Sequence, residues 1–113
     1  MVQLKYFTVL SVHVASGASG SVNFIPREDL LIRRVFATER ANENLSNVFA
    51  DIDFMGVDLT YGDIPVVILG NDVETAYTLE KVLKAGNAIT FNITNKLGVA
   101  IDLDITLECH PPA

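Results

Sequence analysis

The sequence predicts an all-β protein, an antiparallel sandwich or barrel of about eight strands. Apolar and polar residues alternate with a period of two, most clearly between positions 99 and 109. Turns rich in Gly, Pro and Asn separate the alternating segments at intervals of roughly 8–12 residues. Strand and helix patterns do not alternate along the chain, which argues against a parallel sheet.

The N-terminal third predicts three extended segments. Residues 4–15 carry apolar side chains on both parities for part of their length, as expected for a long strand covered on two faces. The turn-forming stretch 16–20 follows, and then a short extended piece at 22–25 that Pro26 closes. Residues 30–37 are rich in β-branched and aromatic residues and predict another strand.

The middle of the chain predicts one kinked strand and one short edge strand. Apolar residues alternate over 48–54, Gly56 interrupts the pattern, and 57–60 resume it, which indicates a bulge or bend. The apolar run 64–69 contains Pro65, which lacks an amide hydrogen, so this segment is expected at a sheet edge or a strand start.

Residues 72–84 are compatible with two structures. Asp72 is a suitable helix N-cap and Gly86 a suitable C-terminal stop. The same stretch also alternates as a strand. The surrounding strands favour a strand near 75–81.

The C-terminal third predicts two strands, 89–94 and 99–109, joined by the turn residues 95–98. We expect these strands to pair antiparallel as a hairpin. Their apolar parity is expected to face the core through Ile89, Phe91, Ile93, Val99, Ile101, Leu103, Ile105 and Leu107.

Length and composition limit the organisation and the partners. At 113 residues and 12.3 kDa, residues 1–113 are expected to form a single β-sandwich domain. The net charge of -6 argues against nucleic-acid binding, which needs clustered cations. We expect no membrane span and no secretory signal. The single cysteine, Cys109, cannot form an internal disulfide.

Two carboxylate pairs are candidate ligands for a hard cation. Asp51 and Asp53, and likewise Asp102 and Asp104, lie two residues apart on the solvent parity of their strands, so each pair faces one way. Aspartates at such positions also simply keep the outer face of a strand hydrated. No metal-binding loop accompanies them, and we expect no metal.

His13, Cys109 and His110 are the residues suited to a soft metal or to nucleophilic catalysis. Cys109 and His110 are neighbours, so an extended strand directs their side chains to opposite faces. The glycines match no phosphate-binding pattern. We therefore expect no catalytic residue, no cofactor and no enzymatic activity.

The basic residues are unevenly distributed and suggest a contact surface. Four arginines lie between positions 27 and 40 of an otherwise acidic chain. Arginine is common in protein contacts and pairs with carboxylates, although ordinary surface salt bridges would use the same residues. The predicted subunit interface comprises Arg27, Arg33, Arg34 and Arg40 with acidic strand faces of a neighbour, Asp51, Asp53, Asp102 or Asp104.

The stretch 83–95, followed by Gly98 and the alternating final strand, resembles the closing hairpin of single jelly-roll virion proteins, which include small capsid, penton, spike and decoration subunits. The resemblance covers mainly residues 83–109. It implies an antiparallel β-sandwich of jelly-roll type and a structural role without catalytic residues. The short chain and the lack of a basic arm favour an accessory, decoration, spike or vertex subunit over the main coat protein.

Two functions follow as expectations. The first is a structural assembly protein of a virion, a homo-oligomer such as a trimer or pentamer that contacts other virion structural proteins. The second is a jelly-roll module that binds a carbohydrate or another ligand. Sugar sites usually present exposed aromatic rings, and this chain has no Trp, so we rank assembly first.

Overall fold

The computed structural model describes residues 6–40, 45–60, 63–70 and 75–112. Its strands and short 3₁₀ helices are, in chain order, β1 (Tyr6–Val14), β2 (Ser19–Phe24), β3 (Leu30–Glu39), η1 (Leu45–Asn47), β4 (Val48–Phe54), β5 (Val57–Asp58), β6 (Ile64–Pro65), η2 (Val66–Leu69), β7 (Tyr77–Leu83), β8 (Ile89–Asn95) and β9 (Ile101–His110). The predicted all-β class is confirmed.

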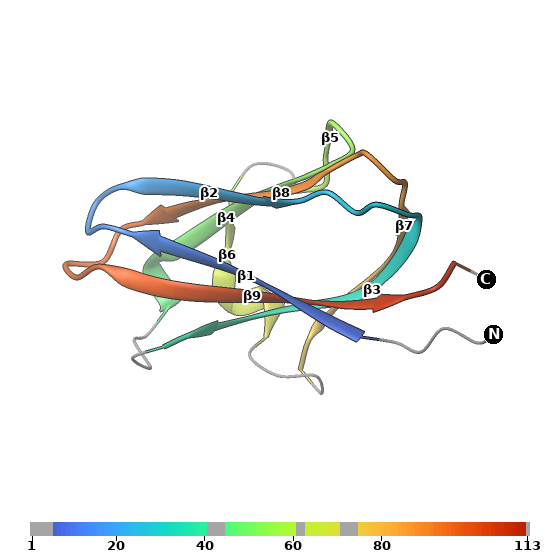
Figure 1. Cartoon of the computed structure of the whole chain (residues 1–113). Helices are drawn as coiled ribbons and strands as arrows, with labels where there is room; N and C mark the ends of the chain where they lie inside the picture. Colours follow the sequence, from blue (N-terminus) through green and yellow to red (C-terminus); the bar gives the residue numbers. More distant parts are fainter. Residues whose placement is uncertain (1–5, 41–44, 61–62, 71–74, 113) are drawn as a thin grey trace.

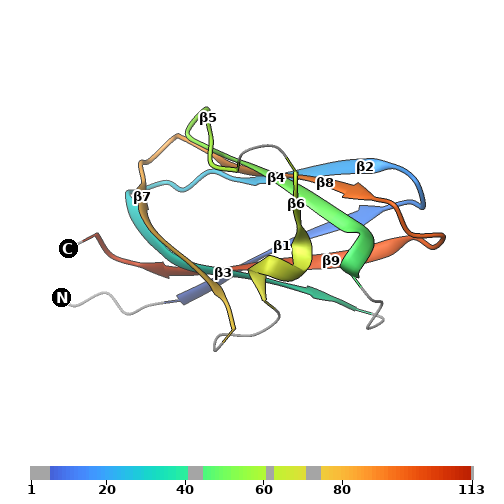
Figure 2. The same ribbon diagram turned by 180° about the vertical axis from the view of Figure 1, so that it is seen from behind.

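The strands form two antiparallel sheets that pack as a sandwich (Figures 1 and 2). One sheet has four strands in the order β1-β9-β3-β7. The other has five, in the order β2-β8-β4-β5, with β6 paired to β4. Most consecutive strands lie in different sheets, so the chain repeatedly crosses from one layer to the other.

The core lies between the sheets, where the alternating parity places it. On β9, the inward residues Ile101, Leu103, Ile105, Leu107 and Cys109 are buried, as predicted. The same holds for β8 with Ile89, Phe91 and Ile93, and for β4 with Val48, Ala50, Ile52 and Phe54. The prediction for Val99 is wrong: it is 47% exposed, because β9 begins only at Ile101 and Val99 lies in the preceding loop.

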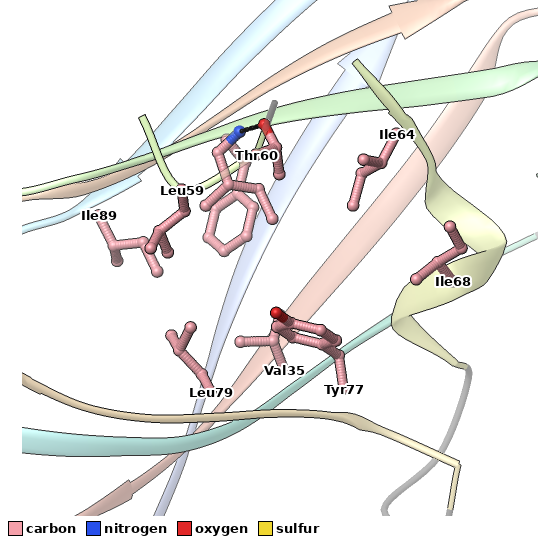
Figure 3. Close-up of a pocket in the computed structure, with 10 residues that line it drawn as sticks. Val35, Leu59, Thr60, Ile64, Ile68, Tyr77, Leu79 and Ile89 are labelled. Carbon is pink, nitrogen blue, oxygen red and sulfur yellow. Dashed lines mark hydrogen bonds between the residues drawn. The ribbon is translucent and has the colours of Figure 1, made fainter. Parts of the chain in front are cut away.

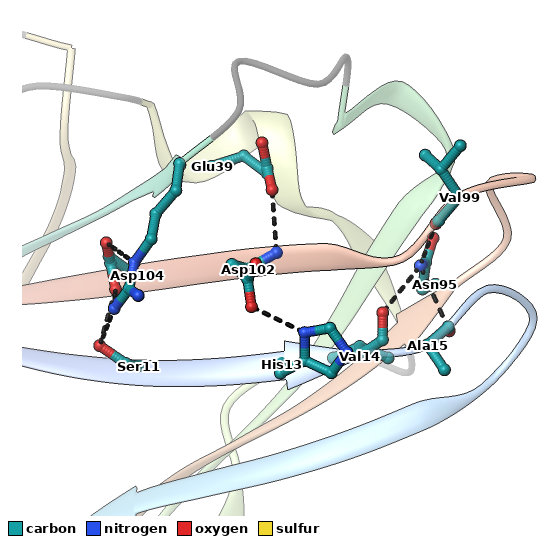
Figure 4. A network of polar contacts seen from close by, with 10 residues as sticks. Ser11, His13, Val14, Ala15, Glu39, Asn95, Val99, Asp102 and Asp104 are labelled. Carbon is teal, nitrogen blue, oxygen red and sulfur yellow. Dashed lines mark hydrogen bonds and ion pairs between the residues drawn. The ribbon is translucent and has the colours of Figure 1, made fainter.

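The expected hairpin of the last two strands is wrong. β8 pairs with β2 and β4, whereas β9 pairs with β1 and β3 in the opposite sheet. The connection between them is a crossover, held by the buried side chain of Asn95 (Figure 4). A tight hairpin and a short crossover both require polar turn residues, and the inward parity of a strand does not identify its neighbour.

Two other expectations change in detail. The interruption at Gly56 is a hairpin turn between β4 and β5, with positive φ at Met55 (53°) and Gly56 (82°), as in a type I′ turn. The strand expected at 64–69 is confirmed only for β6, Ile64–Pro65; the rest of that run is the 3₁₀ helix η2, which buries Val66 and Leu69 at a helical spacing.

The segment that the sequence left open between helix and strand is a strand where it is described. β7 spans Tyr77–Leu83 and pairs with β3. Residues 72–74 of that prediction lie outside the described residues.

Candidate functional site

The outer face of the four-stranded sheet carries an apolar patch, formed by Phe7 and Val9 of β1 and Phe36 of β3. These residues flank the central strand β9: Val9 and Phe36 both lie opposite Thr106, and Phe7 lies opposite Glu108. The rings of Phe7 and Phe36 meet edge to face with centroids 6.4 Å apart. Phe7 and Val9 nevertheless remain exposed, although Thr106 and Glu108 between the flanking strands are buried. We call these three residues the Phe7 patch.

A buried carboxylate lies beside the Phe7 patch. The Glu108 side chain is only 1% exposed, and its Oε2 is 2.5 Å from Nε2 of His110. Its Oε1 is 3.4 Å from Nε of Arg34 on the neighbouring strand. Removing a carboxylate from water is costly unless hydrogen bonds or opposite charges compensate it, and Glu108 has the contact with His110 and the guanidinium of Arg34 for this purpose.

A β-bulge explains how two consecutive arginines reach carboxylates. Along β3, Ile32 lies opposite Cys109 and Arg34 opposite Glu108, so Arg33 is an extra residue relative to β9. The inward parity changes across this point, and neither arginine enters the core. Arg33 instead donates from Nε to Oε1 of Glu80 on β7, at 2.8 Å.

The other side of the patch is bordered by a second charged group. Arg40 donates from Nε to Oδ2 and from Nη2 to Oδ1 of Asp104, both at 3.0 Å (Figure 4). Ser11 donates to the same Oδ1 at 2.7 Å. The hydrogen bonds from Arg40 and then Ser11 lower the pKa of Asp104 below its ordinary value. The carboxylate is therefore held ionised in a fixed orientation.

The next pair along the strands is His13 and Asp102. Nδ1 of His13 lies 2.7 Å from Oδ1 of Asp102, and both side chains are largely exposed. The backbone amide of Asp102 donates to Oε2 of Glu39 at 2.8 Å (Figure 4). Such an exposed pair contributes little to stability, but it holds the Asp102 carboxylate in one orientation at the edge of the outer face.

The structure brings only part of the predicted interface together. Arg34, Arg40, Asp102 and Asp104 share the outer face of the four-stranded sheet, with Arg33 at its β7 side. Three of these arginines pair within the chain: Arg40 binds the predicted Asp104, whereas Arg33 binds Glu80 and Arg34 lies near Glu108, two carboxylates that the sequence analysis did not name. Sequence reasoning missed the Phe7 patch. Its signal in the sequence was that Phe7 and Val9 are apolar although they lie on the parity opposite to Leu10, which faces the core.

The remaining predicted residues lie elsewhere. Arg27 is exposed in the connection between β2 and β3. Asp51 and Asp53 lie on the outer face of the five-stranded sheet, on the parity opposite to the buried residues of β4.

A third carboxylate, which the sequence reasoning missed, joins Asp51 and Asp53. The hairpin places Asp58 opposite Asp53, and single oxygens of all three aspartates lie within 4.8 Å of one another. Thr60 donates to Oδ1 of Asp51 at 2.8 Å. A hydrogen bond with Asp51, then partial desolvation and the charges of Asp51 and Asp53, raise the pKa of Asp58. Oxygen ligands of this kind suit a hard cation, and exposed acidic groups also gather without one.

The predicted soft ligands do not converge. Cys109 is buried in the core, whereas His110 turns to the outer face and contacts Glu108. His13 pairs with Asp102, which β9 places at its opposite end from His110. These three side chains form no common site.

The outer face of the four-stranded sheet thus combines exposed aromatic and aliphatic side chains with charges that are paired within the chain. No family model matches the chain, and no curated protein matches its sequence. Within the described ranges, no helix is both long and apolar enough to cross a membrane.

Proposed function

We propose that this chain is a structural assembly protein, a capsid-associated subunit of a virion that acts as an accessory, decoration, spike or vertex component. Copies contact one another through the outer face of the four-stranded sheet. The observation that carries the proposal is the Phe7 patch, where exposed apolar side chains are bordered by paired charges.

The strand order supports a jelly-roll assignment for the sandwich. Jelly rolls are double-sheet folds of eight strands, and they recur in viral capsid domains. Here the orders β1-β9-β3-β7 and β2-β8-β4-β5 place the first and last strands side by side and interleave the rest between the sheets. The short strands β5 and β6 both pair with β4, so they occupy one position at the edge of their sheet.

Apolar contact supplies the affinity in this proposal. Because the arginines already bind carboxylates of their own chain, they orient the neighbour rather than form its main contact. A head-to-tail contact of this face with a different surface of the next copy would close a ring such as a trimer or pentamer.

The test introduces a charge into the patch and measures the molar mass by sedimentation. Val9→Asp places an unpaired carboxylate in the contact, and burying it costs several kcal/mol. The dissociation constant of the oligomer should therefore rise about a hundredfold or more in the Val9→Asp variant. Val67→Asp is the matched control, because Val67 is 53% exposed against 55% for Val9 and lies on η2, away from this face.

We expect a wild-type oligomer that Val9→Asp dissociates and Val67→Asp preserves, with thermal melts showing that both variants are folded. A monomeric wild type at high concentration would refute the proposal. So would a folded Val9→Asp variant that assembles like the wild type.

The alternative, a ligand- or carbohydrate-binding module, is favoured by one observation. A shallow hollow on the outer face of the five-stranded sheet is lined by hydroxyl, amide and carboxylate side chains suited to sugar hydroxyls, from Ser19, Ser21, Asp51, Asp63, Asn92 and Thr94. A strict monomer that binds glycans on an array would favour this alternative.

A further inference from the structure

An apolar cavity of about 250 Å³ opens between the two sheets, at the side where β7 faces β6 and η2 (Figure 3). Its inner wall is made of core side chains from both sheets: Val35 of β3, Ile52 of β4, and Ile89 and Phe91 of β8. The sandwich is therefore incompletely filled at this side.

The rim of the cavity is apolar and partly exposed. Leu59, Ile64 and Leu79 are half-buried at the opening, and Ile68 is 52% exposed. Water in contact with such a wall finds few hydrogen-bonding partners, so an apolar molecule that displaces it gains favourable free energy.

Two polar side chains line the cavity, and they differ in their availability. The Thr60 hydroxyl is already engaged, since it donates to Asp51 and accepts from the backbone amide of Ile52 at 3.2 Å. The Tyr77 hydroxyl points into the cavity (Figure 3). No residue in the described part of the chain hydrogen-bonds to it, so it remains able to bind a polar group of a ligand.

The size and charge of the cavity define the ligand. A cavity of about 150 Å³ lined by Leu, Ile and Phe binds benzene, so this one accommodates a larger apolar body. No lysine or arginine is among the described lining residues, and Thr60 is bonded to the acidic side chain of Asp51. An anionic headgroup would therefore be repelled and would lack a counter-ion.

We propose that this cavity binds a small neutral amphiphile, a molecule with an apolar body of medium length and one hydroxyl or carbonyl oxygen that pairs with the Tyr77 hydroxyl. The site is separate from the Phe7 patch, because it lies between the sheets rather than on an outer face. Mostly apolar walls with one directing polar group are characteristic of ligand pockets.

The probe is 1-octanol, and its binding is measured by calorimetry and by chemical-shift changes of the lining methyl groups. The decisive pair of variants is Ile68→Trp and Val67→Trp. The two residues are neighbours on η2 with 52% and 53% exposure, but only Ile68 lines the cavity. We expect Ile68→Trp to weaken binding about tenfold or more, by filling the opening, and Val67→Trp to leave it unchanged.

Two further measurements test the chemistry of the ligand. Tyr77→Phe removes only the hydroxyl and should weaken octanol binding about three- to tenfold, while leaving the binding of ethylbenzene unchanged. Octanoate, which has the same chain length and a negative charge, should bind at least about tenfold more weakly than octanol at neutral pH.

Several results would overturn the proposal. They are the absence of octanol binding, equal losses in Ile68→Trp and Val67→Trp, equal affinity for octanoate and octanol, or an unchanged octanol affinity in Tyr77→Phe. Tyr77→Phe keeps the proposal testable if Ile68→Trp fails to fold, because it removes a single oxygen from a partly exposed side chain.

Discussion

Replacing Asn95 by aspartate should destabilise the crossover between the sheets. The Asn95 side chain is fully buried at the end of β8. Its Nδ2 donates to the carbonyls of Val99 at 2.9 Å, Val14 at 3.1 Å and Ala15 at 3.3 Å, and its Oδ1 accepts from the amide of Leu97 at 2.9 Å (Figure 4). Aspartate keeps the shape and the acceptor but removes both donor hydrogens.

The magnitude follows from what a carboxylate must do in this position. An ionised carboxylate in place of the Asn95 amide would face three carbonyl oxygens. Leaving buried acceptors unsatisfied costs about 1–3 kcal/mol each. The carboxyl can instead take up a proton on folding. Because its ordinary pKa is near 3.9, protonating it at pH 7 costs about 4 kcal/mol, and this limits the penalty for burying the charge. We therefore expect Asn95→Asp to lower the free energy of unfolding by about 2–4 kcal/mol at pH 7.

The assay is urea unfolding of wild type and variant between pH 3.5 and 7. The introduced carboxyl has a raised pKa in the folded state, so the part of its penalty that comes from ionisation is absent below the unfolded pKa and grows as the pH rises toward the folded pKa. The control is Asn87→Asp, which adds the same charge to an exposed side chain. A loss below about 1 kcal/mol at pH 7, or a loss that does not shrink in acid, would refute this role for Asn95.

Two further predictions concern the core and the acidic cluster. Leu103→Ala should cost about 2–5 kcal/mol, because Leu103 is 1% exposed, whereas Val99→Ala should change stability by less than about 0.5 kcal/mol; equal effects in urea melts would contradict the assigned parity. Asp58→Asn should be more stable than wild type at pH 7 in chelator-containing buffer and equal to it below about pH 4. The raised pKa of Asp58 means that its ionisation opposes folding as the pH rises, and asparagine does not ionise. A variant that is less stable than wild type at pH 7 would contradict this.

The sequence predicted which side chains face the core because that information is local. In a strand, successive side chains point to opposite faces, so the alternation of Leu103, Ile105 and Leu107 with polar residues is sufficient to assign their burial. Which strand lies beside which is not local. Every inward-facing strand carries the same pattern, and the choice between a hairpin and a crossover after Asn95 depended on carbonyls of β1 and the turn that follows it, far away in the chain.

The site was predictable only as a set of residue types. Composition revealed the bunched arginines and the solvent-facing aspartates, but not that Arg40 and Asp104 meet within one chain. Asp58 was missed because it reaches Asp53 through a two-residue turn that the sequence analysis interpreted as a bend. The Phe7 patch depended on the pairing of β1 with β9, which places Phe7 across from Glu108.

The bulge at Arg33 lies next to the part of β7 that lines the cavity. Relative to β9 this residue is an insertion, but on the other side of β3 two residues of β7, Leu79 and Glu80, lie opposite it. Glu80 adopts a positive φ of 52°, which is unfavourable for a side chain with a Cβ, and the Arg33 guanidinium fixes its carboxylate there. Bulges bend the strand that contains them and disrupt its free edge for pairing. Tyr77 precedes this irregularity and Leu79 lies within it, and both line the cavity, so the irregular part of β7 contributes to the cavity wall.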